Sequence, residues 1–356
     1  MIRVAILGAG VGREHLDGYR QLTEQFTVSV LCDLNSDRAQ KVANVDSAIR
    51  VISDIALVLS DPQIDLVDVC LPPHLHASVV IDALEAGKHV ICEKPIGRSL
   101  AEVQKIGEAV ERARGLFFPV FQYRYGLAMN QLMALRSAGL TGHALVASAE
   151  THWDRDSEYY SVAWRGTWSG EVGGAVLGHA IHCHDLICHI LGPVSEVSAF
   201  TDTRVNDIEV EDCAAINLRM NSGALVTSSV TLGSADDSTR LRLCFEKLTA
   251  QSGSSAYAPM NDTWSFSARG ATSQEDIDRV LMSVTQPHSG FTGYLSAVCE
   301  SVKSGAYEQA ISFEDGRRSI ELVTAIYLST REKRPISLPL KEGCELYNGW
   351  QPSLSQ

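Results

Sequence analysis

The first 120 residues alternate short apolar runs with amphipathic stretches, and this alternation is the strongest constraint on the fold. In stretches such as His74–Ala86 and Leu100–Ala113, apolar residues recur at spacings of three and four, which predicts helices. The apolar runs between them are expected to be strands, with a weaker one near Ile49–Ile52: Arg3–Leu7, Thr27–Cys32, Leu66–Cys70, His89–Cys92 and Phe117–Phe121. Strands that alternate with helices predict a doubly wound parallel sheet with helices on both faces.

A glycine-rich loop, Gly8-Ala9-Gly10-Val11-Gly12, follows the first strand and opens a helix. Gly8 permits a tight turn, and Gly10 lets backbone N–H groups approach a pyrophosphate at the helix N-terminus. The third glycine comes one place early, because Arg13 stands where the usual pattern has it. The loop therefore predicts a dinucleotide site of the Rossmann type.

An acid, Asp33, closes the second strand about 20 residues after Gly12. A carboxylate there can accept hydrogen bonds from the adenosine ribose hydroxyls and would repel a 2′-phosphate, which favours NAD over NADP as the cofactor. The alternative is that Asp33 is the N-cap of a helix that starts near Ser36, although Ser36 could serve as that cap itself.

Beyond about residue 125 the pattern changes to alternating polar and apolar residues, which predicts an α+β domain with a large, mostly antiparallel open sheet. The expected strands are Ala144–Glu150, Glu196–Thr203, Ala214–Met220, Ala224–Thr231 and Leu241–Glu246. Helices are expected at Gly173–Leu191, Phe291–Ser304 and Glu314–Ser329, and loops at Gly233–Ser238 and Gln251–Pro259. The predicted division is a Rossmann domain at 1–123 and a substrate-binding and oligomerisation domain at 124–356, whose C-terminal segment is able to pack back on the first.

Composition narrows the classes of partner. A net charge of −13 would repel a nucleic acid backbone, so no nucleic acid partner is expected. No run of about 20 apolar residues is present to cross a membrane, and the N-terminus lacks a signal-peptide cleavage site. The nine cysteines include no CxxC pair, so we expect reduced structural thiols in a cytoplasmic protein.

The segment from Leu71-Pro72-Pro73-His74-Leu75-His76 to Glu93-Lys94-Pro95 carries a more specific pattern. Together with the glycine loop and His15 after it, it resembles the Gfo/Idh/MocA oxidoreductases, the family of glucose–fructose oxidoreductase and inositol dehydrogenase. The resemblance extends through Trp164-Arg165, Gly173–Asp185 and Asp315-Gly316-Arg317-Arg318, and so covers nearly the whole chain. It implies an NAD-dependent dehydrogenase of carbohydrate metabolism that oxidises a secondary hydroxyl of a polyol substrate, namely a sugar, glycoside or cyclitol. It also implies a homodimer or homotetramer formed through the second domain's sheet, with a monomer left open.

The resemblance names three catalytic candidates. It implies that Lys94 lies at the nicotinamide edge, whereas chemistry alone allows an ordinary surface lysine at a strand end equally well. His182 matches the family histidine, but Gly178 stands where the family usually has an aspartate, and we infer that His179 replaces that carboxylate. In our hypothesis His182 removes the hydroxyl proton, Lys94 stabilises the developing alkoxide or is itself the base, and His179 orients the substrate.

The remaining site residues follow from the same motifs and from their places after strands. Expected to bind the cofactor are Gly8, Gly10, Val11, Gly12, Arg13, Asp33, Leu34, Leu71, Pro72, Pro73, His76, Glu93, Lys94, Gln122, Trp164 and Arg165. Expected to bind the substrate are Lys94, Arg124, Tyr125, His152, Trp153, Trp164, His179 and His182, with His152 and Trp153 facing the same cleft.

The dense group His179, His182, His184, Asp185 and His189 raises the alternative of a metal site. We favour no metal, because His184 lies about 200° around a helix from His182, so that the whole set cannot converge. Buried, hydrogen-bonded histidines are expected at positions 184 and 189.

Two other functions stay open at this point. The glycine at position 178 is compatible with a non-catalytic NAD-binding regulator. A glycoside-cleaving enzyme that keeps NAD bound through a transient redox cycle is the third possibility.

Overall fold

The computed structural model describes residues 1–43, 48–285 and 288–352, which form two compact units. Unit 1 contains Met1–Phe121 and Phe291–Ile320, and unit 2 contains Gln122–Gly290 and Glu321–Gln356. The sequence predicted a division into 1–123 and 124–356, with a C-terminal segment able to pack back on the first domain. In the structure the first boundary falls after Phe121, and the segment that belongs to unit 1 is Phe291–Ile320, whereas Glu321–Gln356 belongs to unit 2. No helix in the described part of the chain is long and apolar enough to cross a membrane.

Unit 1 is built on a six-stranded parallel sheet with the strand order β3-β2-β1-β4-β5-β6, the order of a dinucleotide-binding Rossmann fold. The strands are β1 (Ile2–Leu7), β2 (Phe26–Cys32), β3 (Arg50–Ile52), β4 (Leu66–Val69), β5 (His89–Cys92) and β6 (Phe117–Pro119). All four residues of β4 are buried, as expected for a central strand with helices on both faces. The fold predicted for this half is confirmed.

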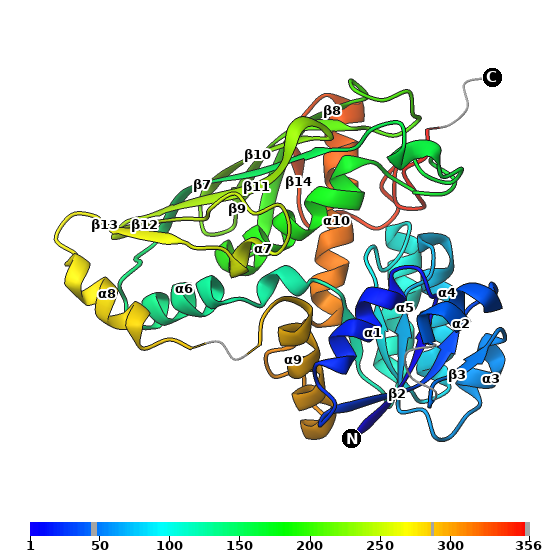
Figure 1. Cartoon of the computed structure of the whole chain (residues 1–356). Helices are drawn as coiled ribbons and strands as arrows, with labels where there is room; N and C mark the ends of the chain where they lie inside the picture. The colour runs from blue at the N-terminus through cyan, green and yellow to red at the C-terminus, as the bar shows by residue number, and fades with distance from the viewer. Residues whose placement is uncertain (44–47, 286–287, 353–356) are drawn as a thin grey trace. The chain divides into compact units, whose positions relative to one another are not determined.

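The helices of unit 1 cover this sheet and are drawn around it in Figure 1. They are α1 (Gly12–Arg20), α2 (Ser36–Ala43), α3 (Ile55–Leu59), α4 (Pro73–Glu85), α5 (Leu100–Arg112), α9 (Gly290–Ser304) and the first part of α10 (Phe313–Glu332). At the start of α2, neither Asp33 nor Ser36 is the cap: the Asn35 side chain accepts the backbone N–H of Arg38 at 3.0 Å.

The segment that returns to unit 1 is held there by aromatic contacts. Phe291 lies against the ring of His15, with centroids 4.2 Å apart, and occupies the space that a side chain at position 18 would need. Phe313 lies in the same way over Gly107 and packs against Phe117. Glycines at positions 18 and 107 therefore make room for rings that come from more than 200 residues further along the chain.

Unit 2 is built on an eight-stranded mixed sheet with the order β13-β12-β11-β7-β10-β9-β8-β14. Its strands are β7 (Ala144–Asp154), β8 (Val194–Asp202), β9 (Cys213–Met220), β10 (Leu225–Thr231), β11 (Gly233–Phe245), β12 (Leu248–Gln251), β13 (Ser265–Ala268) and β14 (Ile336–Ser337). The pairing is antiparallel except between β7 and β10. The predicted mostly antiparallel sheet is thus confirmed.

The prediction of a loop at Gly233–Ser238 is wrong. The segment forms the start of β11 and pairs with β7 across an irregularity between Gly233 and Ser238. The glycine, serine and aspartate residues that suggested a loop supply a bulge, where such residues are common.

The helices of unit 2 are α6 (Leu127–Ser137), α7 (Ile181–Leu191), α8 (Gln274–Met282) and the end of α10. A π-helical turn at Val176–Ala180 leads directly into α7, so the helix expected at Gly173–Leu191 is irregular in its first part. Figure 1 shows α7 running along one face of the sheet. Short 3-10 turns lie at Gln122–Arg124, Tyr159–Ser161 and Pro259–Asn261.

Candidate active site

The carboxyl ends of the unit 1 strands meet at one edge of the sheet. Leu7 pairs with both Cys32 and Val69, and Val69 pairs with Cys92. The segments that follow these strands carry the glycine loop, Asp33, the Leu71-Pro72-Pro73 turn and the Glu93-Lys94-Pro95 motif. Ligands of open parallel sheets bind at this edge, beside the point where the strand order reverses.

The glycine loop has the backbone that a pyrophosphate site requires. Gly8 has a φ of +100°, and a Cβ placed there would lie 2.4 Å from the Cys70 carbonyl oxygen. A Cβ at Gly12 would lie 2.7 Å from Ile6 Cγ2, so this glycine allows α1 to approach β1 despite its early position. Gly10 has nothing within 4 Å of its Cβ position, which leaves space for phosphate oxygens next to the backbone. These residues fit an NAD pyrophosphate.

Asp33 is nearly buried at the end of β2, with 5% of its surface exposed. Its carboxylate accepts hydrogen bonds from the backbone N–H groups of Ala9 (2.7 Å) and Asn35 (2.7 Å), and it forms an ion pair with Arg38 at 2.8 Å. Burial opposes ionisation, but the hydrogen bonds from Arg38, Ala9 and Asn35 lower the pKa of Asp33 below its ordinary value. An ionised acid therefore stands where the adenosine ribose would bind. Leu34, the next residue, and Val11 in the glycine loop both have exposed side chains.

His76, expected to contact the cofactor, lies buried in the first turns of α4. Its ring nitrogens lie 2.7 Å from the Pro95 carbonyl oxygen and 2.6 Å from the Leu71 carbonyl oxygen. Burial lowers its pKa. The ring thus ties together the segments that follow β4 and β5.

Lys94 follows β5 and is partly buried. Its backbone N–H donates to Glu93 Oε2 at 3.1 Å, and its peptide bond to Pro95 is cis. The lysine therefore lies at the edge of the sheet formed by the carboxyl ends of the strands, which we call the cofactor edge. Its backbone N–H is hydrogen-bonded to the side chain of the preceding glutamate.

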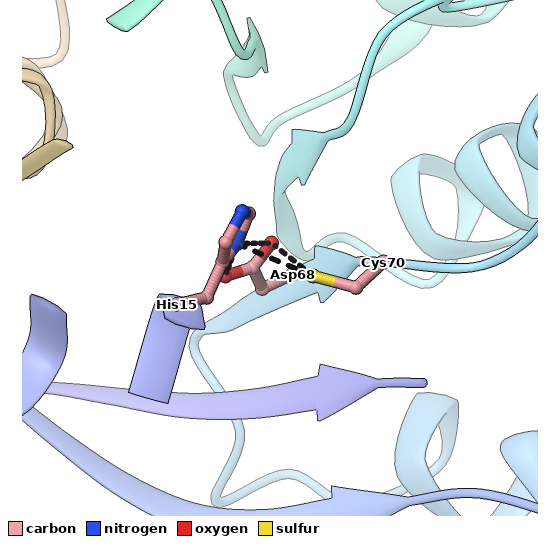
Figure 2. Close-up of side chains that lie close together, drawn as sticks. All are labelled: His15, Asp68 and Cys70. Atoms are coloured by element: carbon pink, nitrogen blue, oxygen red, sulfur yellow. Dashed lines mark hydrogen bonds and ion pairs between the residues drawn. The ribbon is translucent and has the colours of Figure 1, made fainter. Parts of the chain in front are cut away.

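His15, Asp68 and Cys70 form a buried polar cluster (Figure 2). The cluster adjoins the Glu93-Lys94-Pro95 segment, because His15 Nε2 lies 3.0 Å from Glu93 Oε1. His15 Nδ1 lies 2.9 Å from Asp68 Oδ2 and 3.2 Å from Cys70 Sγ. Tyr19 donates its hydroxyl to the same aspartate oxygen at 2.9 Å. Sequence reasoning missed Asp68, because an acid inside an apolar strand carries no signal until its partner is known.

The three ligand-type atoms of this cluster lie within 4.8 Å of one another, as atoms around a metal ion do. In the structure, however, each is hydrogen-bonded to another member of the set. Burial, and then the negative charge of Asp68, raises the pKa of the Cys70 thiol well above its ordinary value, so that it is a neutral thiol. We therefore assign the cluster as a hydrogen-bond network and do not assign its members as metal ligands.

The two catalytic candidates of unit 2 lie on neighbouring turns with different surroundings. His182, in the first turn of α7, is stacked on Tyr123, with ring centroids 4.6 Å apart. His179 lies in the π-helical turn and meets the ring of Trp153 edge-on at 5.2 Å. A regular α-helix would place residues three positions apart on one face, but the π-turn that contains His179 changes this spacing. Tyr123 carries no motif, and sequence reasoning missed it.

The other members of the histidine group do not converge with these two. His184 is buried and lies 3.0 Å from the Ser228 hydroxyl, and burial lowers its pKa to about 4, so the prediction of a buried structural histidine is confirmed there. For His189 the same prediction is wrong, because its side chain is exposed near the end of α7. Asp185 forms a buried, two-pronged ion pair with Arg124, at 2.7 and 2.5 Å. The Arg124 guanidinium, expected to bind substrate, is thus engaged by a carboxylate.

His152 and Trp153 do not line the same surface, and that expectation is wrong. Neighbouring residues of a strand point to opposite faces of the sheet. Trp153 is buried against His179, whereas His152 lies on the other face, 2.8 Å from the Ser229 hydroxyl.

Aromatic and basic side chains gather around the short turn at Tyr159–Ser161. The Arg165 guanidinium lies 3.9 Å from the Tyr159 ring centre and 5.5 Å from that of the half-exposed Trp164. Arg155 lies over Trp153 and Tyr159 and is paired with Asp237 at 3.1 Å. The Trp164-Arg165 pair was predicted, whereas Arg155 and Tyr159 were missed because they lie outside the motif.

Two further candidates begin unit 2. Gln122 opens the 3-10 turn at Gln122–Arg124, and Tyr125 follows that turn and accepts the Gly290 N–H at 2.7 Å. Lys94 belongs to unit 1 and His182 to unit 2. Their approach across a shared cleft therefore stays a prediction.

Comparison with known proteins identifies the class. The family model described as "Oxidoreductase family, NAD-binding Rossmann fold" matches residues 2–121, and that of the GFO/IDH/MocA C-terminal domain matches residues 129–251. The chain therefore belongs to the GFO/IDH/MocA oxidoreductase family and is an oxidoreductase with an NAD-binding Rossmann domain.

Individual relatives cover almost the whole chain. It is 25% identical to the myo-inositol 2-dehydrogenase of Thermotoga maritima, over 95% of this chain and 98% of that protein. It is 27% identical to the D-apiose dehydrogenase of Paraburkholderia graminis, over 94% and 89%. Among solved structures, the WlbA dehydrogenase from Bordetella pertussis in complex with NADH and UDP-GlcNAcA is similar, with a TM-score of 0.83 and 27% identity over 96% of this chain and 99% of that one.

Proposed function

We propose that the protein is an NAD-dependent dehydrogenase that oxidises a secondary hydroxyl group of a sugar, glycoside or cyclitol. The observation that carries the proposal is the position of the Glu93-Lys94-Pro95 segment. It follows β5 at the same edge of the sheet as the glycine loop and Asp33, in a chain whose two halves match the two models of a dehydrogenase family. Relatives named for a cyclitol and a sugar support this class of substrate.

In the proposed mechanism, the residues of the chain bind the alcohol and move its proton. Bound NAD supplies the acceptor for the hydride that leaves the alcohol carbon. The Lys94 ammonium stabilises negative charge that develops on the alcohol oxygen, and the His182 imidazole accepts the hydroxyl proton. His179, held against Trp153, orients the substrate in place of the aspartate that position 178 lacks.

Around this centre, Trp164 and the Arg165 guanidinium offer flat surfaces against which a sugar ring or the cofactor can stack. Tyr125 and Trp153 complete the proposed substrate contacts. We also propose a cytoplasmic location, in keeping with nine cysteines that are all free thiols.

The open face of the unit 2 sheet supports a further proposal, a homodimer or homotetramer. Phe200, Val146 and Leu225 are apolar side chains on this face and are 73%, 49% and 46% exposed. Apolar groups of this kind are typical of self-association surfaces.

The proposal is tested with a substrate panel and with Lys94→Ala. Myo-inositol, D-apiose, levoglucosan and UDP-sugar acids are incubated with NAD or NADP, and reduced cofactor is followed by its absorbance. With the best substrate, Lys94→Ala is expected to lower turnover by roughly two to four powers of ten while NAD still binds. Unchanged turnover in this variant would remove Lys94 from the mechanism.

The same absorbance separates the proposal from its two competitors. A dehydrogenase accumulates NADH, whereas a glycoside-cleaving enzyme with a transient redox cycle forms product without net NADH. A regulator shows no substrate-dependent change. The regulator is favoured only by the glycine at position 178.

Gly178→Asp tests that observation directly. A Cβ at this position has nothing within 4 Å, so the variant is expected to fold. If His179 replaces the carboxylate, the new aspartate should leave turnover within a few-fold or lower it. A rise in turnover from near zero would instead show that the glycine had disabled the site.

A further inference from the structure

The ring of His15 is placed between two carboxylates. Nδ1 lies 2.9 Å from Asp68 Oδ2, and Nε2 lies 3.0 Å from Glu93 Oε1. A neutral imidazole carries a single N–H and can donate to one of these groups, whereas the imidazolium donates to both. Because both partners are acids, the geometry favours a protonated ring.

Among the contacts that the structure describes, no other positively charged group faces the His15 imidazole and opposes its protonation. On α1, Tyr19 donates to Asp68, and beyond β4 the thiol of Cys70 lies against Nδ1 (Figure 2). On α9, the Phe291 ring covers the imidazole, and Tyr294 lies close to Tyr19. Burial would lower the pKa of His15, but the charge of Asp68 outweighs it and raises the pKa well above its ordinary value.

The second carboxylate connects this buried pair to the catalytic segment. Glu93 Oε1 faces His15, and Glu93 Oε2 accepts the backbone N–H of Lys94 at 3.1 Å. The Glu93 side chain keeps 16% of its surface exposed, whereas Asp68 is fully buried. The aspartate therefore anchors the ring from inside, and the ring holds the glutamate at the cofactor edge.

From this arrangement we infer that His15 is a positioning residue, which acts through Glu93 to fix the backbone of Lys94 at the carboxyl end of β5. The inference rests on the proposed function for its link to catalysis, but the link from His15 to the Lys94 backbone is testable without any substrate. We call the chain of contacts from Asp68 through His15 to Glu93 the clamp. Removing the clamp should loosen the Lys94 segment and misplace the Lys94 ammonium group.

The first test measures the segment itself, in the full chain with NAD alone. Two variants cut these contacts at different points. His15→Phe/Asp68→Asn keeps a ring against Phe291 and leaves no unpaired carboxylate at position 68, and Glu93→Gln changes only the outer, partly exposed partner. The Lys94 amide is expected to exchange its hydrogen roughly tenfold faster or more in the double variant, with amides of β1 and β4 unchanged. The matched control is His89→Gln, at the opposite end of β5, which should leave the Lys94 amide as it is.

The second test measures the charge on His15 by NMR titration of its ring. The wild-type imidazole should stay protonated well above neutral pH. In Glu93→Gln its pKa should fall by about one unit or more, because one carboxylate is gone and an amide can donate to a neutral ring. A purely structural role for Glu93 would not move this titration.

The third test links the clamp to turnover. Glu93→Gln should lower kcat by roughly tenfold with the NAD Kd within about threefold, and in a Lys94→Ala background the same change should lower kcat little further.

If Lys94→Ala has normal turnover, the proposed function fails, and amide exchange and the NMR titration still decide the positioning role. The inference is overturned if the Lys94 amide exchanges no faster in the double variant, if the His15 pKa is unchanged in Glu93→Gln, or if Glu93→Gln costs the same in both backgrounds. Should the double variant not fold, the titration and the cycle with Glu93→Gln carry the decision.

Discussion

Gly8 and Gly10 lie two residues apart in one loop, but different requirements select glycine at each. Gly8 has a positive φ and faces the Cys70 carbonyl oxygen at short range, so any side chain there strains the fold. Gly10 has open space beside it, so a side chain there would meet only a ligand. The fold therefore requires the first glycine, and we expect the second to be required by the cofactor.

This difference predicts opposite behaviour for two alanine variants. Gly8→Ala should destabilise the protein by about 2 kcal/mol or more, because a Cβ would lie 2.4 Å from a backbone oxygen. Gly10→Ala should melt within a few degrees of wild type but bind NAD at least about tenfold more weakly. Thermal melting and NAD titration, followed by tryptophan fluorescence, measure both, and a loss of stability in Gly10→Ala would contradict the assignment.

Asp33 predicts the cofactor preference. Asp33→Asn removes the charge that opposes a 2′-phosphate, and the neighbouring Arg38 then becomes available to bind one. The ratio of NAD to NADP affinity should fall by roughly tenfold or more, since a hydrogen bond to a charged group contributes about 1.5–3 kcal/mol. Asp37→Asn, an exposed acid in the first turn of α2, is the matched control and should leave the ratio unchanged.

At the scale of elements, the start of α7 depends on one buried acid. Glu211 accepts the backbone N–H groups of Gly174 (3.1 Å) and Val176 (3.0 Å) and the Tyr327 hydroxyl (3.0 Å). These bonds hold the residues that lead into the π-turn, and thereby the segment that carries His179 and His182.

Glu211→Ala should therefore cost about 3 kcal/mol or more of the free energy of unfolding, since it leaves two amides and a hydroxyl without their acceptor. The loss is measured by urea denaturation. Glu209 is an exposed neighbour whose side chain accepts the backbone N–H of Trp168, and Glu209→Gln should cost less than about 1 kcal/mol. Equal losses in the two variants would show that Glu211 does not hold this segment.

The same acid predicts a pH dependence. Burial raises the pKa of Glu211 from an ordinary value of 4.5 to about 7, so the folded state binds this proton more tightly than the unfolded state does. Its contribution to stability is fully present below pH 4.5 and is lost as the pH rises to about 7, by up to about 3 kcal/mol. In Glu211→Gln this part of the pH dependence should disappear, and a slope identical to that of wild type would contradict the assignment.

Most elements could be predicted because their sequence pattern is local. The glycine loop, β5 and α4 are set by turn residues and apolar spacing within a few residues, and their predicted bounds hold to within one residue. The segment Gly233–Ser238 was misread because its polar residues form a bulge, and only pairing with β7 makes it a strand. Local composition carries no information on such a distant partner.

The residues of the candidate site divide in the same way, into those with a local sequence signal and those that depend on distant partners. Asp33 and the Glu93-Lys94-Pro95 segment could be placed from motifs at strand ends. Asp68 and Tyr123 could not, because their roles exist only through contacts with residues more than 50 positions away, His15 and His182.

At the scale of the whole molecule, the chain passes between the two units three times, after residues 121, 290 and 320. Residues 122–290 are thus an insertion into unit 1, and its ends are close together, because the Gly290 N–H donates to the Tyr125 carbonyl oxygen at 2.7 Å. The segment after residue 290 then supplies Phe291 and Phe313, which cover His15 and Gly107.

A shortened chain tests this reading. Residues 1–125 joined through a few glycines and serines to residues 290–320 should fold cooperatively and bind NAD. Residues 1–121 alone should melt at least about 10 °C lower or not fold, because two aromatic contacts and their apolar surface are missing. Equal melting temperatures would show that the returning segment adds nothing to unit 1.

The hydrogen bond between Gly290 and Tyr125 has a consequence for engineering. The chain leaves unit 1 and returns to it at two positions that lie side by side. This pair is therefore a natural junction for exchanging the inserted segment between members of the family while unit 1 is kept unchanged. Such a chimera would also have to carry residues 321–356 of the donor protein, because this segment belongs to unit 2 together with residues 122–290.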